Sequence, residues 1–143
     1  MRKNLIVIDT NVLISSLIGQ HGYSHKIFDE LVLTLEVKIC LSREILEEYH
    51  EVANRPRFAK YLNFTMTANK LIKRLEKIAV YVEPTERINV LPDEDDNKFL
   101  EAAVEAGAGC VVTGNTNDFT VQEFMGVKIY TPKEFYEIWA LAE

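Results

Sequence analysis

The sequence predicts one α/β domain over residues 1–143, with a mostly parallel central sheet flanked by helices. Short, branched apolar runs alternate along the chain with segments in which apolar residues recur at helical spacing. The sequence contains neither internal repeats nor low-complexity linkers. A length of 143 residues and a hydrophobic content of 48% are enough for one sizeable core, so a globular domain is expected.

The first half of the chain begins with a strand at Leu5–Ile8, because this run is uniformly apolar and branched. Asp9 follows that strand directly. Apolar residues at helical spacing predict helices over Asn11–Ile18 and Ser24–Leu35. The next expected elements are a strand at Val37–Leu41, a helix that Ser42 caps and Arg55-Pro56 ends, a helix over Thr67–Ile78 and a strand at Val80–Val82.

In the second half, Asp93 is the expected cap of a helix that runs to Gly107. A strand at Cys110–Thr113 then leads into the turn-rich segment GNTND, and Val127–Tyr130 is the last expected strand. The run from Thr131 to Glu134 is a capping box with proline at the first helical position.

The sequence predicts a cytoplasmic protein without a membrane anchor. No apolar stretch approaches the roughly 20 residues that a spanning helix needs, and no cleavage site follows the first apolar run. Cys40 and Cys110 each lie in a short apolar run, which favours buried free thiols over a disulfide.

Charge is distributed unevenly along the chain. The net charge is −6, yet residues 55–77, here called the basic arm, carry +6 and the remainder carries −12. The cations of the basic arm are Arg55, Arg57, Lys60, Lys70, Lys73, Arg74 and Lys77. An acidic body with one basic arm suits a metal-dependent enzyme acting on a phosphate polymer, and it equally suits a solvated lysine-rich helix.

Two acidic positions follow predicted strands. Ligands of open parallel sheets bind beyond the carboxyl ends of the strands, where Asp9 and the 115–118 turn are expected. Asp9 alone is equally well explained as the N-cap of the helix that follows it.

Four adjacent acids, residues 93–96, precede the helix that ends at Gly107. At about 100° per residue, Asp96 falls near the centre of the apolar stripe around Phe99 and Ala103, whereas Glu94 lies opposite. The helix dipole explains acids in a first turn, but an inward-facing Asp96 is costly to bury unpaired. We therefore expect Asp96 to belong to a functional site.

The same projection places only Glu48, of the four glutamates after Ser42, beside an apolar stripe. Asp9, Glu48, Asp96 and Asp118 are thus expected to converge from four separate elements. Converging carboxylates raise one another's pKa unless a cation compensates, and oxygen ligands favour Mg²⁺ or Mn²⁺. No spacing of cysteines and histidines indicates zinc.

Four segments follow one another along the chain: IVIDTNVLIS, LSREILEEY, DEDDNKFLEAA and VVTGNTNDF. Together they resemble the PIN-domain ribonucleases, many of which are toxins of toxin–antitoxin pairs. The resemblance implies that the carboxylates coordinate Mg²⁺ or Mn²⁺ for the hydrolysis of RNA. It also implies a homodimer and a small protein antitoxin that covers the site. It implies that Thr10 and Thr113 support the site by hydrogen bonding. Asn11 and Asp93 are also expected to be supporting residues.

The chain departs from the family pattern at Asn115, where an acid is common. Asparagine offers a carbonyl oxygen but no charge, so a second metal ion is expected to bind weakly unless Asp118 replaces that acid. Asp96 or Asp118 is expected to accept the proton of the attacking water. The basic arm is expected to hold the RNA backbone, with Tyr61 or Phe64 as a stacking surface.

Other functions are also compatible with an acid after the first strand. Haloacid-dehalogenase-type phosphatases need an acid where this chain has Asn11, and receiver domains need paired acids near Asn4–Ile8, so both are disfavoured. The remaining alternative is a PIN-like module that binds RNA or protein with a weakened metal site. Metal binding without RNA cleavage distinguishes this alternative from a nuclease.

Overall fold

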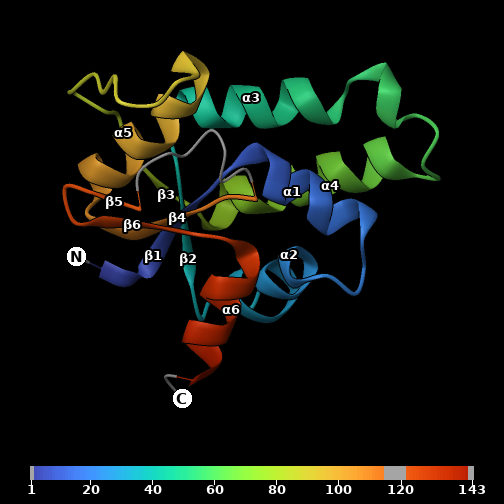
Figure 1. Ribbon diagram of the computed structural model, residues 1–143. Coiled ribbons are helices and arrows are strands. Elements are labelled where there is room, and N and C mark those ends of the chain that lie inside the picture. The colour runs from blue at the N-terminus through green and yellow to red at the C-terminus, as the bar shows by residue number, and fades with distance from the viewer. Residues whose placement is uncertain (1, 115–121, 142–143) are drawn as a thin grey trace.

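The sheet contains six strands in the order β3-β2-β1-β4-β6-β5 (Figure 1). The computed structural model describes residues 2–114 and 122–141. All neighbouring strands run parallel except β5 and β6, which confirms the predicted mostly parallel sheet. The strands are β1 (Arg2–Ile8), β2 (Lys38–Leu41), β3 (Val80–Tyr81), β4 (Ala108–Val112), β5 (Glu123–Phe124) and β6 (Val127–Tyr130).

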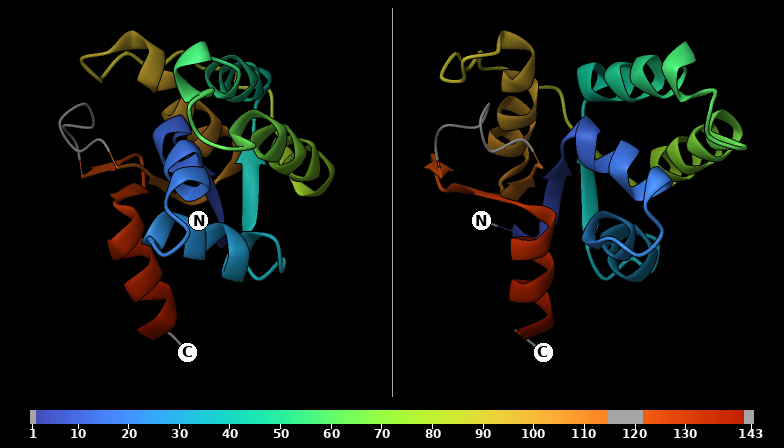
Figure 2. Two further views of the ribbon diagram at one scale, coloured as in Figure 1. Left: turned by 90° about the vertical axis from the view of Figure 1, so that its right-hand side faces the viewer. Right: turned by 45° about the vertical axis from the view of Figure 1, so that its right-hand side comes forward.

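Helices cover both faces of the sheet (Figure 2). Helix α5 (Asn97–Ala106) packs against β1, β2 and β4 on one face, whereas α1 (Thr10–Ile18), α3 (Arg43–Ala53) and α4 (Phe64–Ile78) group on the other. Helix α6 (Pro132–Leu141) follows β6 and packs against α2 (Tyr23–Lys26). Within the described ranges, no helix combines the length and apolar character needed to cross a bilayer.

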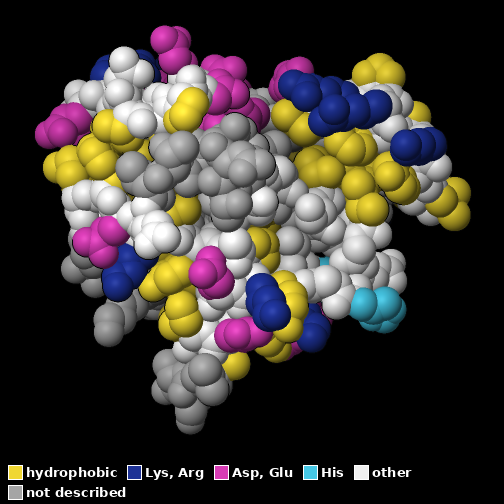
Figure 3. Space-filling view, in the orientation of Figure 1, with side chains coloured by type: hydrophobic (Ala, Val, Ile, Leu, Met, Phe, Trp, Pro, Cys, Tyr) yellow, Lys and Arg dark blue, Asp and Glu magenta, His cyan; other side chains and the backbone are white. Residues whose placement is uncertain are grey.

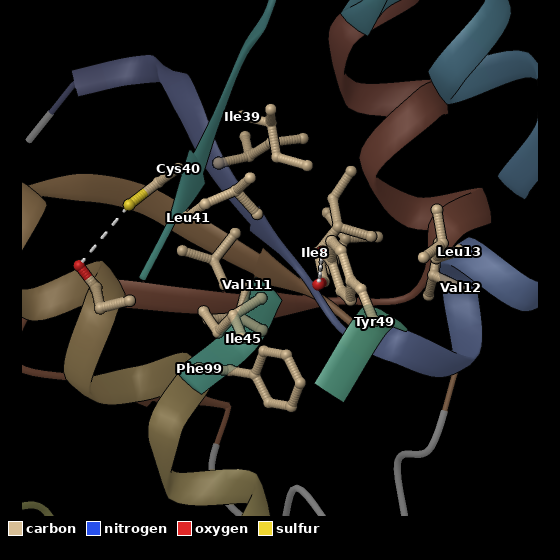
Figure 4. Packing of buried hydrophobic residues seen from close by; sticks show 14 of the residues in the cluster. Ile8, Val12, Leu13, Ile39, Cys40, Leu41, Ile45, Tyr49, Phe99 and Val111 are labelled. Atoms are coloured by element: carbon tan, nitrogen blue, oxygen red, sulfur yellow. Dashed lines mark hydrogen bonds between the residues drawn. The ribbon is translucent and has the colours of Figure 1, made fainter. Parts of the chain in front are cut away.

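The core is built around β1, which lies between β2 and β4. Residues Leu5–Ile8 are at most 1% exposed, as expected for a strand covered by helices on both faces. Figure 4 shows side chains from β1, β2, β4, α1, α3 and α5 in this core. The backbone N–H of Asp9 donates to Val112 O at 2.9 Å, so the pairing of β1 with β4 extends to the start of α1.

Both cysteines are buried thiols outside any disulfide, as predicted. The Cys40 thiol lies 3.9 Å from Ala102 O, to which it donates (Figure 4). Burial raises the pKa of the Cys110 thiol to about 12.

The expected helix over Ser24–Leu35 is confirmed as far as Val32, but it changes type along its length. After α2 the chain continues as a π-helix, η1 (Ile27–Val32), and Leu33 N–H donates to Phe28 O at 2.9 Å. The wider turn lets Ile27, Phe28, Leu31 and Val32 all reach the core. Leu35, the last residue of the expected helix, lies beyond the π-helix and is 56% exposed.

The start of one helix and the presence of one strand also differ from the prediction, because of tertiary contacts. Helix α4 begins at Phe64, three residues before the expected Thr67, since the ring of Phe64 stacks on buried Phe58 at 4.7 Å between centroids. Strand β5 was not predicted, and it pairs with β6 through a turn at Met125 and Gly126, whose φ angles are 49° and 85°. A turn of this type favours glycine and joins two strands in a tight hairpin.

One face of α5 fastens the preceding loop. The residues of this face are Asn97, Glu101 and Glu105, each four positions apart on the helix. Their side-chain oxygens accept the backbone N–H groups of Leu91, Ile88 and Thr85 at 3.1, 2.9 and 2.9 Å. The loop is thereby held against α5, and the short 3₁₀ helix η3 (Glu94–Asp96) is placed at the N-terminus of that helix.

Helix α3 is attached to the end of β1 by a buried hydrogen bond. The Tyr49 hydroxyl donates to Ile8 O at 2.5 Å, and both residues are fully buried (Figure 4). Burial, followed by the charges of Asp9 and Glu48, raises the pKa of Tyr49 well above its ordinary value. The hydroxyl is therefore a permanent donor at this position.

Replacing Tyr49 by phenylalanine is expected to lower the free energy of unfolding by about 1–3 kcal/mol, because Ile8 O loses its buried partner. Urea unfolding followed by circular dichroism measures the change. Tyr136→Phe is the matched control, since the Tyr136 hydroxyl donates to Glu30 Oε1 at 2.7 Å on the surface. An equal loss of stability in both variants would contradict the importance of the buried bond.

Candidate active site

Asp9 and Thr113 meet beyond the carboxyl ends of β1 and β4. Asp9 is the N-cap residue of α1, so the simpler interpretation of this acid is right about its position. Its carboxylate has a further partner, because Thr113 Oγ1 donates to Asp9 Oδ2 at 2.6 Å. Asp9 is 5% exposed and Thr113 is fully buried. A carboxylate in this environment needs a cation or several donors to remain ionised.

The electrostatics of Asp9 reflect that need. The pKa of Asp9 is raised from 3.8 to about 6, chiefly by burial and in part by the negative charge of Glu48. The Thr113 hydrogen bond and the backbone amides of Asn11 and Thr10 oppose the rise in pKa. The two acids are therefore close enough to repel each other, and a divalent cation between them would relieve the repulsion.

Glu48 approaches from α3 and is held by two donors. Thr10 Oγ1 donates to Glu48 Oε2, and Lys98 Nζ donates to Glu48 Oε1 at 2.6 Å. The side chains of Lys98 and Glu48 are 14% and 23% exposed. Glu47 and Glu51 are exposed, which confirms that Glu48 is the inward member among these three.

Asn11 is exposed and lies at the same edge of the sheet. Its Oδ1 accepts the backbone N–H of Gly114 at 3.2 Å, which connects the start of α1 to the residue after Thr113. Thr10, Asn11 and Thr113 thus all make hydrogen bonds around Asp9 and Glu48, although their functional roles stay a prediction.

The acids of the PDEDDN segment are sorted as expected. Asp93, Glu94 and Asp95 are exposed, whereas Asp96 is partly buried. Asp93 is the N-cap of η3, and its Oδ1 accepts the Asp95 N–H at 3.0 Å. Asp96 lies two residues before Lys98, whose ammonium contacts Glu48. The segment that carries Asp96 therefore reaches the site.

The residues at this edge of the sheet have the donor chemistry of a hard divalent ion. Asp9 and Glu48 offer only oxygen ligands, and burial together with the charge of Glu48 makes the ionised form of Asp9 costly. Among the described residues, however, no three His, Cys, Asp or Glu side chains are grouped closely enough to hold a metal ion. Asn115 and Asp118 lie outside the described residues, so the predicted set of metal ligands stays a prediction.

A groove of about 660 Å³ opens between α3, η3 and the start of α5. Seven carboxylates and three cations are among its lining residues. Figure 3 shows Asp and Glu side chains gathered along the top of the molecule, over this region. The cations are Arg55, Arg87 and Lys98, and each forms an ion pair with a glutamate. The groove is therefore strongly acidic and repels a polyanion.

The basic arm shares Arg55 with this groove, and its other cations lie over the turn between α3 and α4 and along α4. Its cations on α4 follow the spacing of one helical face and are exposed: Lys70, Lys73, Arg74 and Lys77. Figure 3 shows Lys and Arg beside hydrophobic side chains at the upper right, over the α3–α4 turn. Phe64 is only 4% exposed, so its expected stacking role is wrong, whereas Tyr61 is 38% exposed.

Sequence reasoning missed two residues of the site, Lys98 and Tyr49. Lys98 lies off the apolar stripe of α5, and its partner is 50 positions away, so periodicity carried no signal for it. Tyr49 was recognised only as a core residue. Its position next to Glu48 is the available clue, since a buried tyrosine hydroxyl nearly always finds a partner.

Asp9→Asn is expected to stabilise the metal-free protein at neutral pH. Burial disfavours the ionised Asp9 carboxylate only in the folded state. The free energy of unfolding of the parent, relative to that of the variant, therefore falls as pH rises from 3.8 through about 6. Above that range the difference reaches about 2–3 kcal/mol. Urea unfolding in EDTA at pH 4.5, 6 and 7.5 measures it, and a difference that does not change with pH would contradict the raised pKa.

Comparison with known proteins shows the family of this chain. The PIN domain family matches residues 5–117. The chain is 34% identical to Uncharacterized protein MJ1680 of Methanocaldococcus jannaschii, over 94% of this chain and 91% of that protein. A chain in the crystal structure of VapBC2 from Rickettsia felis, bound to a DNA fragment from their promoter, shares the fold. The TM-score is 0.57 at 10% identity, over 89% of this chain and 98% of that one. PIN domains are generally nucleases, and this chain belongs to the PIN domain family.

Proposed function

We propose that the protein is a metal-dependent endoribonuclease, and that it is the toxin component of a toxin–antitoxin pair. The observation that carries the proposal is the buried Asp9 carboxylate beside Glu48, at the carboxyl edge of the parallel sheet of a PIN domain. Two acids held together in this way at a sheet edge form a suitable site for a divalent cation.

Asp9, Glu48 and Asp96 would hold Mg²⁺ or Mn²⁺, with Asp118 or the Asn115 carbonyl as a further ligand. Such an ion would neutralise charge that develops on the scissile phosphate and lower the pKa of the attacking water. The oxygen-only donor set fits either ion.

The protein's own groups orient the acids and handle the proton. The hydroxyls of Thr113 and Thr10 fix the carboxylates of Asp9 and Glu48 through the hydrogen bonds described above. Asp96 or Asp118 accepts the proton of the attacking water. Because Asp9 has a pKa of about 6 without a cation, protons compete with the metal below that pH, and the activity is expected to fall there.

The charge distribution supports a path for the RNA. The backbone of a polyanion is repelled by the acidic groove and attracted by the exposed cations of α4 and of the α3–α4 turn. Arg55 belongs to both surfaces, since it lines the groove and begins the basic arm. RNA held by the basic arm therefore reaches the site past Arg55, with Tyr61 as a stacking surface.

The toxin assignment includes a protein antitoxin, a homodimer and a cytoplasmic location. The shared fold with a chain of the VapBC2 structure supports the antitoxin. Leu62 and Met66, which are 92% and 54% exposed, lie within the basic arm and give an apolar surface for a protein partner.

The test of the proposed function is cleavage of a mixed RNA panel with Mg²⁺, with Mn²⁺ and with EDTA. The parent is expected to cleave only with metal, and Asp96→Asn is expected to lose at least about 100-fold in rate, because it loses a charged ligand. Asp95→Asn is the matched control: it removes the same charge from the neighbouring, exposed position and should retain activity.

Each result separates the hypotheses. Equal cleavage by the parent and Asp96→Asn would identify a contaminating nuclease or a wrong site. Metal binding without cleavage in every variant would instead favour the binding module, in which Asn115 has weakened the site.

Combined replacement of Lys70, Lys73 and Arg74 by glutamine is expected to weaken RNA binding and lower its salt dependence. The slope of log K against log salt should fall by about 0.7 for each lost contact with a phosphate of single-stranded RNA. Fluorescence anisotropy with Ca²⁺ in place of Mg²⁺ measures the affinity. Lys128→Gln, at an exposed lysine on β6, serves as control, and an unchanged slope in the triple variant would exclude α4 as the RNA surface.

A further inference from the structure

The ion pair between Lys98 and Glu48 differs from the other ion pairs of the described residues. It is the only one in which both side chains are less than one quarter exposed, and its 2.6 Å separation is the shortest. Surface pairs such as Lys133–Glu137, with a 4.0 Å separation and both side chains more than half exposed, are of little energetic consequence. A pair as sheltered as Lys98–Glu48 is strongly coupled, because solvent screens it less.

The place of this ion pair gives it a specific meaning. Glu48 raises the pKa of the buried Asp9, so the two acids already repel each other. Lys98 reaches Glu48 from α5, across the boundary between that helix and α3, and supplies a positive charge to this acidic pair. We infer that Lys98 is the built-in counter-cation of Glu48, and that it competes with the divalent ion for this carboxylate. The inference rests on the proposed metal site.

The competition follows from how Glu48 is occupied. Oε1 accepts from Lys98 and Oε2 accepts from Thr10, so both oxygens have donors. The threonine hydroxyl is neutral and compatible with a bound cation, whereas the ammonium repels one. Each cation therefore lowers the affinity of the other for Glu48. Lysine suits this role, since its flexible stem lets the ammonium leave, and Lys98 lines the open groove.

The consequence is that the site binds a divalent ion more weakly than the same carboxylates would bind it without Lys98. Without metal, Lys98 neutralises Glu48 and limits the repulsion with Asp9. When the metal ion is bound, the ammonium of Lys98 turns into the groove and donates hydrogen bonds to other carboxylates there. Lys98 is thus a positioning residue, which acts on the metal through Glu48.

The test is the affinity of the purified full chain for Mn²⁺ without RNA, measured by isothermal titration calorimetry. Lys98→Gln is expected to bind Mn²⁺ at least about tenfold more tightly, because a like charge is removed from the site. Lys98→Arg keeps the charge and should resemble the parent. Lys133→Gln makes the same charge change at an exposed lysine of α6 and should leave the affinity unchanged.

A measurement on the parent protein makes the test independent of variant folding. The ammonium protons of Lys98 are sheltered in the ion pair, and their exchange with solvent, followed by ¹⁵N NMR, should accelerate when Mg²⁺ is added. Equal or weaker Mn²⁺ binding by Lys98→Gln, or unchanged exchange at saturating Mg²⁺, would overturn the inference.

Asp9→Asn in the same titration separates this inference from the proposed function. If Asp9→Asn abolishes Mn²⁺ binding while Lys98→Gln leaves it unchanged, the metal site stands and the competition is wrong. If neither the parent nor any variant binds Mn²⁺, both the metal site and the competition are wrong.

Discussion

The buried bond from the Tyr49 hydroxyl to Ile8 O is the contact on which the site depends. It lies at the end of β1 and holds α3 against the sheet, because both groups are fully buried and neither has access to water. Glu48 precedes Tyr49 on the same helix, so the bond that holds one residue also places the other. Asp9 follows Ile8 directly. The hydrogen bond between the uncharged residues Tyr49 and Ile8 therefore brings Glu48 and Asp9 together.

Bringing two carboxylates together has an electrostatic cost, and the chain offsets it with donors from different elements. Thr113 donates from the end of β4, Thr10 from the start of α1 and Lys98 from α5. The pKa of Asp9 nevertheless remains raised to about 6, chiefly because the carboxylate is buried and in part because Glu48 is near. In the proposed site, a divalent cation would relieve this cost, and Lys98 would set how strongly that cation is held.

The separation of charge over the surface complements the site. The groove between α3 and α5 is acidic and its cations are already paired, whereas the exposed face of α4 is basic. The net charge of −6 therefore describes neither surface. A cation is attracted to one and a phosphate backbone to the other, and Arg55 lies where they meet.

The sequence alone determined the alternation of strands and helices, the inward direction of Glu48 and Asp96, the caps at Ser42 and Asp93, and the resemblance to PIN domains. Each of these follows from residues close together in the chain, where hydrophobic spacing reports which side of an element faces the core. The π-helix at Ile27–Val32, the early start of α4 and the attachment of the loop to α5 were decided by packing between segments. So was the pairing of Lys98 with Glu48, since it joins positions 50 residues apart on two helices. Local periodicity does not encode such a distance, and only the tertiary structure brings the two charges together.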